Sequence, residues 1–311
     1  MTSSQVEVTH PSGAYARVIA DSVSPSGQRV TSIQARFWRP ILAEVNTHAV
    51  WSRNSASSRA IPARKQVQRV REDPSLPVSW PAEQKGMQGG AELEGEQLHA
   101  AQAHWGLAQK TMAQIADHLI EIGLHKSVTN RLLEPFQWHT ALITATAWDN
   151  AFRQRVSPLA QPEFRVVATC MKEAIDQSTP VLLDRGQWHM PYLDSETIAD
   201  VLDHSPDGME MLKQISVARC ARTSMETQEG VRDWAQDLNL YKRLETADPM
   251  HASPFEHVCT PAKWNSHSVD VPDPDTSEVI YSITLPKLGK FLGWQQFRHV
   301  IEAQQKVQSF S

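Results

Sequence analysis

The chain of 311 residues carries 30 Lys and Arg against 35 Asp and Glu, and a net charge of −5 disfavours non-specific binding of nucleic acid polymers. Hydrophobic residues make up 41%, enough for a sizeable core, yet no apolar run reaches the ~20 residues of a membrane span. Three scattered cysteines without a CxxC pair argue against a disulfide scaffold and, with no basic and apolar leader, favour the cytoplasm.

The N-terminal half alternates between turn-rich and apolar stretches. Residues 1–34 are polar, with room for a short strand or two, and an apolar run follows at 40–45. Seven Pro and Gly residues between 73 and 95 predict a long loop. Apolar residues then recur at steps of three and four over 98–122, which predicts a helix of roughly 40 Å ended by Gly123. Such an apolar stripe must pack against another long helix, either within this chain or in a second copy of it.

The C-terminal half is also mostly helical by its periodicity. Alternation at 279–285 predicts a strand, and the polar, Pro- and Asp-rich stretch at 264–278 predicts a loop. Helices are expected at 139–155, 163–175, 196–217 (two short ones around a turn at 205–208), 231–246 and 287–307. Several long helices with few strands predict an α+β fold.

Six clusters of polar side chains carry the candidate chemistry. The first, residues 48–59, holds four serines, one asparagine and two arginines, which suit a phosphate or a pyrimidine edge, although a capped turn explains them too. Two histidines and a glutamate at 251–257 raise a metal site, but the spacing fits no metal motif, so we predict none. The chain also lacks GxGxxG, GxxxxGK[ST] and GxSxG. The remaining clusters are 130–135, 150–163, 218–224 and 291–299.

Together these clusters resemble the flavin-dependent thymidylate synthases. The family signature is Arg-His-Arg, two residues, Ser, one, Asn, two, Ser, one, Arg. Five of its seven fixed positions match, at His48, Ser52, Asn54, Ser57 and Arg59. Thr47 and Ala49 replace both arginines of the triplet. Residues 130–135 resemble the family's Ala-Arg-x-x-Leu-Pro element, and 150–163 its Asn-Phe-Leu-x-Leu-Arg and Ala-Gln-Trp-Glu elements.

The order of the blocks departs from the family pattern. Its usual first blocks, Ala-Ala-Arg-x-Ser, His-x-Ser-Pro-Phe-Glu-His and the Phe-Val-x-Arg-Gln-x-x-Arg-His-Arg stretch, come last here, at 219–224, 251–257 and 291–299. The chain therefore resembles a circular permutation, which is tolerable where the original termini lie close together. His48 and His299 both match the family's single histidine. The resemblance covers roughly 36–62, 123–176 and 215–300 and leaves 73–122 and the insertion 264–278 unaligned.

The resemblance implies both a fold and a reaction. The fold would be α+β, with long helices packed on a small antiparallel sheet and regions 1–195 and 196–311 forming one intertwined catalytic unit. The reaction would be methylation of dUMP to dTMP, in which methylenetetrahydrofolate supplies the carbon, reduced FAD the hydride, and NADPH reduces the flavin. Family members build their sites between subunits of a homotetramer, so an oligomer is expected.

Residue roles follow by matched position. The implied catalytic residues are Ser57, Arg59 and Arg155. The implied nucleotide-binding residues are Ser57, Arg59, Arg131, Arg155, Gln295 and Arg298. The implied flavin-binding residues are His48, Asn54, Asn150, Ser224, His257, Arg298 and His299. Two alternatives stay open: an enzyme that adds a hydroxymethyl or other one-carbon group to a pyrimidine nucleotide, and a non-catalytic flavin- or nucleotide-binding protein.

Overall fold

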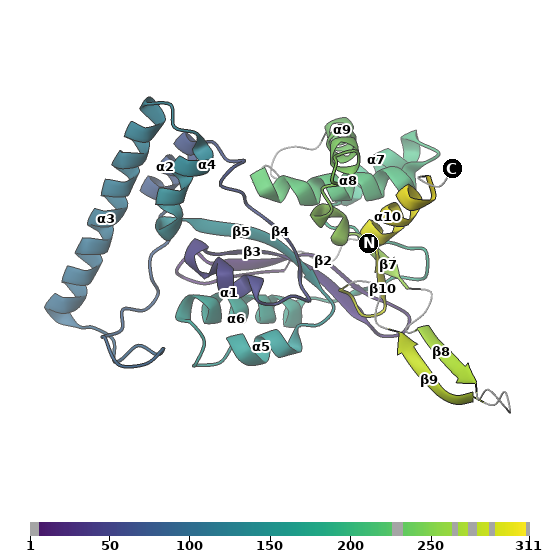
Figure 1. Ribbon diagram of the computed structural model, residues 1–311, viewed down its shortest axis with the longest axis horizontal. Coiled ribbons are helices and arrows are strands. Elements are labelled where there is room, and N and C mark those ends of the chain that lie inside the picture. Colours follow the sequence, from purple (N-terminus) through teal and green to yellow (C-terminus); the bar gives the residue numbers. More distant parts are fainter. Residues whose placement is uncertain (1–5, 226–232, 263–266, 273–278, 286–289, 309–311) are drawn as a thin grey trace.

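The central element is a mixed sheet near the middle of the molecule (Figure 1). The computed structural model describes residues 6–225, 233–262, 267–272, 279–285 and 290–308. The sheet is antiparallel except for the pair of β6 with β2. Its strand order is β1 (Glu7–Thr9), β2 (Tyr15–Val23), β3 (Arg29–Trp38), β5 (Trp138–Ala145) and β4 (Ser52–Ser55), with β6 (Val181–Leu182) beside β2. With the helices around it, the sheet makes an α+β fold, as predicted.

The two faces of the sheet differ in chemistry because side chains alternate along each strand. Ile33, Ala35 and Phe37 of β3 face an apolar core that α6 (Pro162–Gln177) covers. Ser32 and Gln34, which alternate with them, are buried on the other face. Figure 1 shows α5 (Asp149–Arg155) and α6 on one side of the sheet and α7 to α9 on the other. The second face is therefore a buried polar surface between the sheet and the C-terminal helices α7 to α9.

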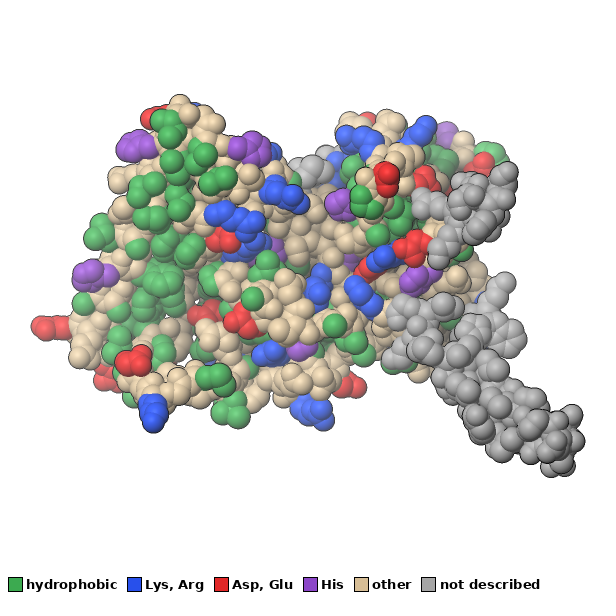
Figure 2. Space-filling view, viewed as in Figure 1, with side chains coloured by type: hydrophobic (Ala, Val, Ile, Leu, Met, Phe, Trp, Pro, Cys, Tyr) green, Lys and Arg blue, Asp and Glu red, His purple; other side chains and the backbone are tan. Residues whose placement is uncertain are grey.

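The predicted long helix is present as α3 (Gly95–Glu121), and Gly123, with φ 82°, follows its end. The expectation that the long helices pack on the sheet holds for α6 but not for α3. The main contacts of α3 are with α2 (Ala63–Glu72) and the 3-10 helix η2 (Asn130–Phe136), beside α4 (Lys126–Thr129). Leu107, Ile115 and Ile122 stay exposed, and Figure 2 shows hydrophobic side chains along this helix.

The C-terminal part is a helical layer held together by a buried ion cluster. Arg219 and Arg222 of α8 donate to Asp237 of α9 at 3.0 and 2.8 Å, and all three side chains are buried. Paired in this way, the charges fasten the two helices together. The elements are α7 (Ser195–His204), α8 (Gly208–Arg222), η3 (Thr223–Met225), α9 (Trp234–Glu245), η4 (Ser253–Glu256), the strand pair β7 (Cys259–Pro261) and β10 (Trp294–Gln296), and α10 (Phe297–Gln308).

Several predicted elements are wrong. The helix expected at 139–155 begins as strand β5, because its short apolar run fits a buried strand as well as a helix turn. The loop expected at 264–278 contains β8 (His267–Pro272), which pairs with the correctly predicted β9 (Val279–Leu285); residues 263–266 and 273–278 lie outside the described residues. The helix expected at 287–307 begins only after β10. Within the described ranges, no helix is long and apolar enough to cross a membrane.

Candidate functional site

Residues 47–59, named here the signature segment, lie where the two parts of the chain meet. The segment follows the short helices η1 (Arg39–Ile41) and α1 (Leu42–Asn46) and includes β4, which pairs with the edge of β5. Ser52 and Asn54 alternate with Arg53 along β4, so both face the buried polar side of the sheet. Local strand geometry therefore points two side chains of the motif toward the C-terminal part.

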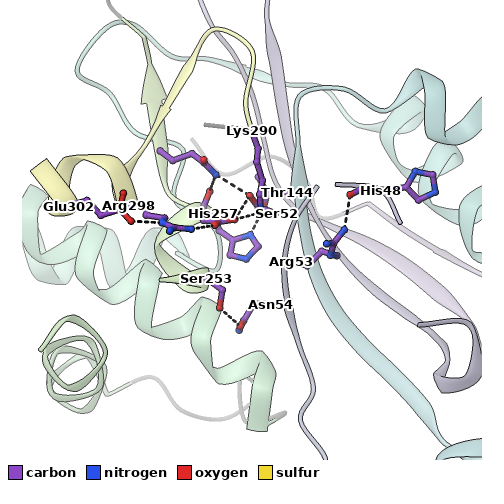
Figure 3. A network of polar contacts seen from close by, with 12 residues as sticks. His48, Ser52, Arg53, Asn54, Thr144, Ser253, His257, Lys290, Arg298 and Glu302 are labelled. Carbon is purple, nitrogen blue, oxygen red and sulfur yellow. Dashed lines mark hydrogen bonds and ion pairs between the residues drawn. The ribbon is translucent and has the colours of Figure 1, made fainter. Parts of the chain in front are cut away.

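Three clusters of the C-terminal part bind the signature segment directly. Ser52 donates to the Glu256 carboxylate at 2.7 Å, and Gln296 donates to the Ser52 hydroxyl at 3.0 Å. Asn54 donates to the Cys220 carbonyl at 2.6 Å, and Ser253 donates to the Asn54 side chain at 3.2 Å. The 218–224, 251–257 and 291–299 clusters thus converge on two inward-facing residues of β4, and Figure 3 shows the hydrogen bond between Ser253 and Asn54.

The two remaining clusters bind the other positions of the segment. The Nδ2 of Asn130 donates to the Ser58 carbonyl at 2.7 Å, so the 130–135 cluster joins here. Arg155 donates from Nε to His48 Nε2 at 3.1 Å and lies over the Phe164 ring, 4.8 Å from its centroid. The backbone N–H of Ser57 also donates to the Ser224 carbonyl, at 3.0 Å. All five other clusters therefore hydrogen-bond to the signature segment.

Glu256 is the charged centre of this network. Its two carboxylate oxygens accept from Ser52, from Lys290 at 2.7 Å and from Arg298 at 2.6 Å. Burial alone acts to raise the pKa of Glu256, but the hydrogen bonds from Lys290, Ser52 and Arg298 and the Lys290 charge lower it by more. The carboxylate is therefore ionised at neutral pH. Arg298 also pairs with Glu302 at 2.7 Å (Figure 3).

Two histidines of the site, His48 and His257, are neutral at pH 7, because burial lowers their pKa values. The pKa of His48 falls to about 4, first through burial and then through the Arg155 and Arg53 charges. The pKa of His257 falls to about 3, mainly through burial. His257 Nδ1 bonds to the Thr144 hydroxyl at 2.8 Å, whereas its Nε2, like His299 Nδ1, is buried without a partner among the described residues.

A chain of hydrogen bonds continues from His257 across the polar face of the sheet. Thr144 bonds to the Ser32 hydroxyl at 2.6 Å, and Ser32 bonds to His189 at 2.8 Å. His189 in turn reaches Ser22 at 2.9 Å. Hydroxyl groups and imidazole rings therefore meet one another's hydrogen-bonding needs in this polar interface. The same contacts fix the position of the C-terminal part on the sheet.

Other predicted residues have only local contacts among those described. The Arg131 guanidinium pairs with Glu134 at 3.0 Å and its side chain is 57% exposed. Asn150 accepts from Arg153 on its own helix at 2.9 Å, and the Arg59 side chain is exposed. Gln295 alternates with Gln296 on β10, and it is Gln296 that turns inward to Ser52. These predicted residues therefore line the periphery of the network.

Several network residues were missed by sequence reasoning. Ser52 matched the signature but received no role, and Glu256 was considered only as a metal ligand. Gln296 lay in the 291–299 cluster but received no role. Lys290 and Thr144 carried no sequence signal, because only the fold brings them to Glu256 and His257. The described residues contain no group of three His, Cys, Asp or Glu arranged to hold a metal.

The cysteines do not form a nucleophilic site. All three are unpaired and buried, and burial raises the thiol pKa values, that of Cys170 to about 11. Because only the thiolate is a strong nucleophile, these thiols are poor candidates for covalent catalysis.

Two cavities lie beside the network. One, of about 730 Å³, is lined by residues of β2, β6 and 186–198, including His189. The other, of about 280 Å³, lies between the sheet and α2. Among the described residues, none of the predicted site residues lines either cavity.

Comparison with solved structures finds partial likenesses. A UMP/dUMP methylase, PolB from Streptomyces cacaoi, solved with 5-Br dUMP, matches 50% of this chain and 68% of its own, at 15% identity and a TM-score of 0.38. Thymidylate synthase X (ThyX) from Helicobacter pylori, solved with FAD and dUMP, matches 47% of this chain and 67% of its own, at 17% identity and a TM-score of 0.33.

The structural matches include the family that the sequence motifs resemble. Both TM-scores describe a partial likeness in fold. No protein-family model and no curated protein sequence matches the chain.

Proposed function

We propose that the chain is a flavin-dependent enzyme that methylates dUMP to dTMP, with methylenetetrahydrofolate as the carbon donor and NADPH as the source of electrons. One observation carries the proposal: the five other motif clusters, spread from residue 130 to residue 299, all hydrogen-bond to the signature segment. A chance sequence resemblance gives no reason for these stretches to meet.

The residues present suit a flavin. Two of the histidines matched to flavin binding, His257 and His299, each keep a buried ring nitrogen without a partner among the described residues. A buried polar atom normally has a hydrogen-bond partner, so these nitrogens favour a ligand that completes the site. We assign His48, Asn54, Asn150, Ser224 and Arg298 to the same cofactor. Bound reduced FAD would supply the hydride.

The nucleotide would be held by the cationic edge of the site. Asn130 ties the 130–135 cluster to Ser58, which brings the exposed arginines Arg131 and Arg59 to the same edge as Ser57. Guanidiniums bind phosphate oxygens in pairs and keep their charge, so this edge suits the 5′-phosphate of dUMP. Gln295 and Arg298 complete the proposed nucleotide contacts.

Arg155 has the central chemical role in this proposal. Its guanidinium is oriented by His48, by the Thr47 hydroxyl at 3.2 Å and by the Phe164 ring. Placed beside a pyrimidine oxygen, it would stabilise the negative charge that develops as the ring is activated, with Ser57 and Arg59 holding the base. Neutral His48 accepts the Arg155 hydrogen bond and so keeps the guanidinium in position.

The loss of both triplet arginines favours one alternative. Thr47 and Ala49 cannot donate as arginines do, although Arg155 reaches Thr47 and supplies one guanidinium there. A pocket altered at these positions fits an enzyme that adds a hydroxymethyl or other one-carbon group to a pyrimidine nucleotide. The first proposal is preferred because His48, Ser52, Asn54, Ser57 and Arg59 all keep their spacing.

The proposal extends to the chain's organisation. Regions 1–195 and 196–311 would form one catalytic unit with permuted block order, which the polar contacts between them support. A homotetramer would complete the site, and a second copy would cover the exposed apolar residues Leu107, Ile115 and Ile122 of α3.

Product analysis tests the proposal. The full chain loaded with FAD is incubated with dUMP, methylenetetrahydrofolate and NADPH, and the nucleotide product is identified by mass spectrometry. Formation of dTMP supports the first proposal. A product that is heavier than dTMP by one oxygen atom supports the hydroxymethyl alternative. A chain that binds no flavin, or that binds flavin and leaves every pyrimidine nucleotide unchanged, contradicts both.

A further inference from the structure

The cavity of about 280 Å³ has the composition of a ligand site. It lies between α2 and the polar side of the sheet, where Gln34, Arg36 and Thr140 alternate with core residues. It borders the signature segment, because the Thr140 carbonyl accepts the backbone N–H of Ala56 at 2.9 Å. Its volume is slightly below the usual range of ligand cavities, roughly 300 to 1,000 Å³, so the occupant must be small.

The walls present hydrogen-bond donors without matching acceptors. Gln137 is 6% exposed, and its Nε2 is buried without a partner among the described residues. The Tyr15 hydroxyl accepts from Gln34 Nε2 at 2.8 Å, and the Gln34 oxygen is taken by the Tyr192 hydroxyl at 2.9 Å. The Tyr15 proton is therefore available for a ligand. Because an unpaired buried donor is costly, these groups favour an occupant rich in acceptors.

The side chains that line the cavity indicate more closely which class of ligand it could bind. Among the described residues, its charged lining residues are Arg36, Arg69 and Asp73. Arg36 pairs with Asp73 and is stacked on the Trp138 ring, 4.4 Å from its centroid. A guanidinium placed over a ring in this way can present its other side to a planar ligand. Tyr15 and Phe136 add aromatic walls.

We propose that this cavity binds a small planar ring that carries a carboxylate or a phosphate. Arg69 and Gln137 contact the anionic or carbonyl oxygens, and Arg36 lies against the ring. Two sources fit this chemistry, an aryl carboxylate and a pyrimidine mononucleotide. The proposal does not depend on the flavin reaction, because the cavity shares no residue with the site assigned to that reaction.

Calorimetric titration of the full chain tests the proposal. The probes are benzoate, dUMP and inorganic phosphate. We expect benzoate or dUMP to bind more tightly than phosphate, because the ring adds contacts. Arg69→Gln should weaken binding of the ring-bearing probe, benzoate or dUMP, about tenfold or more, which is the effect of losing one charge-assisted hydrogen bond. Gln137→Met, which removes the donors but keeps the length, should weaken it severalfold. Circular dichroism verifies that both variants are folded.

Arg64→Gln is the matched control, because Arg64 is an exposed residue of the same helix that does not line the cavity. Binding of benzoate alone identifies an aryl carboxylate site, and binding of dUMP that Arg69→Gln weakens identifies a mononucleotide site. The proposal is overturned if no probe binds, if phosphate binds as tightly as the ring-bearing probes, or if Arg69→Gln and Arg64→Gln behave alike. Binding of dUMP that is lost in Arg155→Ala but kept in Arg69→Gln overturns a nucleotide site here and supports the proposed reaction site.

Discussion

Substitution of Glu256 by glutamine tests whether the buried carboxylate joins the two parts of the chain. The change keeps size and shape but removes the charge that Lys290 and Arg298 bind. Ser52 is fully buried, so weakening its hydrogen bond to this side chain costs about 1 kcal/mol. The Lys290 and Arg298 side chains are 37% and 36% exposed, so water compensates in part and each loss is about 0.5–1 kcal/mol. We therefore expect Glu256→Gln to destabilise the fold by about 2–3 kcal/mol.

Urea unfolding followed by tryptophan fluorescence and far-ultraviolet circular dichroism measures this effect. At a typical dependence of about 2 kcal/mol per molar urea, the midpoint should fall by about 1–1.5 M. Glu302→Gln is the matched control, since Glu302 pairs with the same Arg298 on the exposed surface of α10. That pair should contribute less than about 0.5 kcal/mol. Equal, small effects of the two substitutions would refute the assignment of Glu256 as the centre of the network.

Three further predictions concern pH, the triplet and assembly. Burial lowers the pKa of His189 to about 4 and of His257 to about 3 from 6.5, so the unfolded chain binds more protons below 6.5. Stability should be constant above pH 7 and fall between pH 6.5 and 4 by up to about 1.4 kcal/mol per pH unit for each histidine; equal urea midpoints at pH 7 and 5 would argue against buried neutral rings. Ala49→Arg should tighten FAD binding severalfold in a fluorescence titration, by restoring a guanidinium to the triplet; weaker or unchanged binding would count against the alignment. Leu107→Glu should lower the mass measured by light scattering if a second copy covers α3, whereas an unchanged mass would leave that helix outside the assembly.

Local periodicity explains which elements the sequence predicts well. The apolar stripe of α6 and the stripe of α3 followed by Gly123 are local patterns, so both helices are present near their predicted bounds. The apolar run in β5 is short, a pattern that a buried strand and a buried helix share, so tertiary pairing with β3 decides its structure. The Pro and Asp residues around β8 predicted a loop, but this segment forms a strand because it pairs with β9.

In the candidate site, too, the residues that belong to a local motif could be predicted, whereas those selected by tertiary pairing could not. His48, Asn54 and Arg155 are found from motif spacing, and the structure brings His48 and Arg155 into contact. Gln296 could not be chosen over Gln295, because which of the two faces inward depends on how β10 pairs with β7. The role of Glu256 as an ion-pair centre depends on cations from residues 290 and 298, which only the fold brings to it.

Binding of dUMP to the wild-type chain and to Arg155→Ala, with FAD present, most directly tests the claim that the signature segment forms a flavin and nucleotide site. Lys172→Ala, which removes an exposed cation from α6 outside the network, serves as the control. The account predicts that Arg155→Ala weakens dUMP binding at least about tenfold while FAD stays bound, and that Lys172→Ala changes neither. Equal dUMP affinities in all three proteins, or no dUMP binding to the wild type, would contradict it.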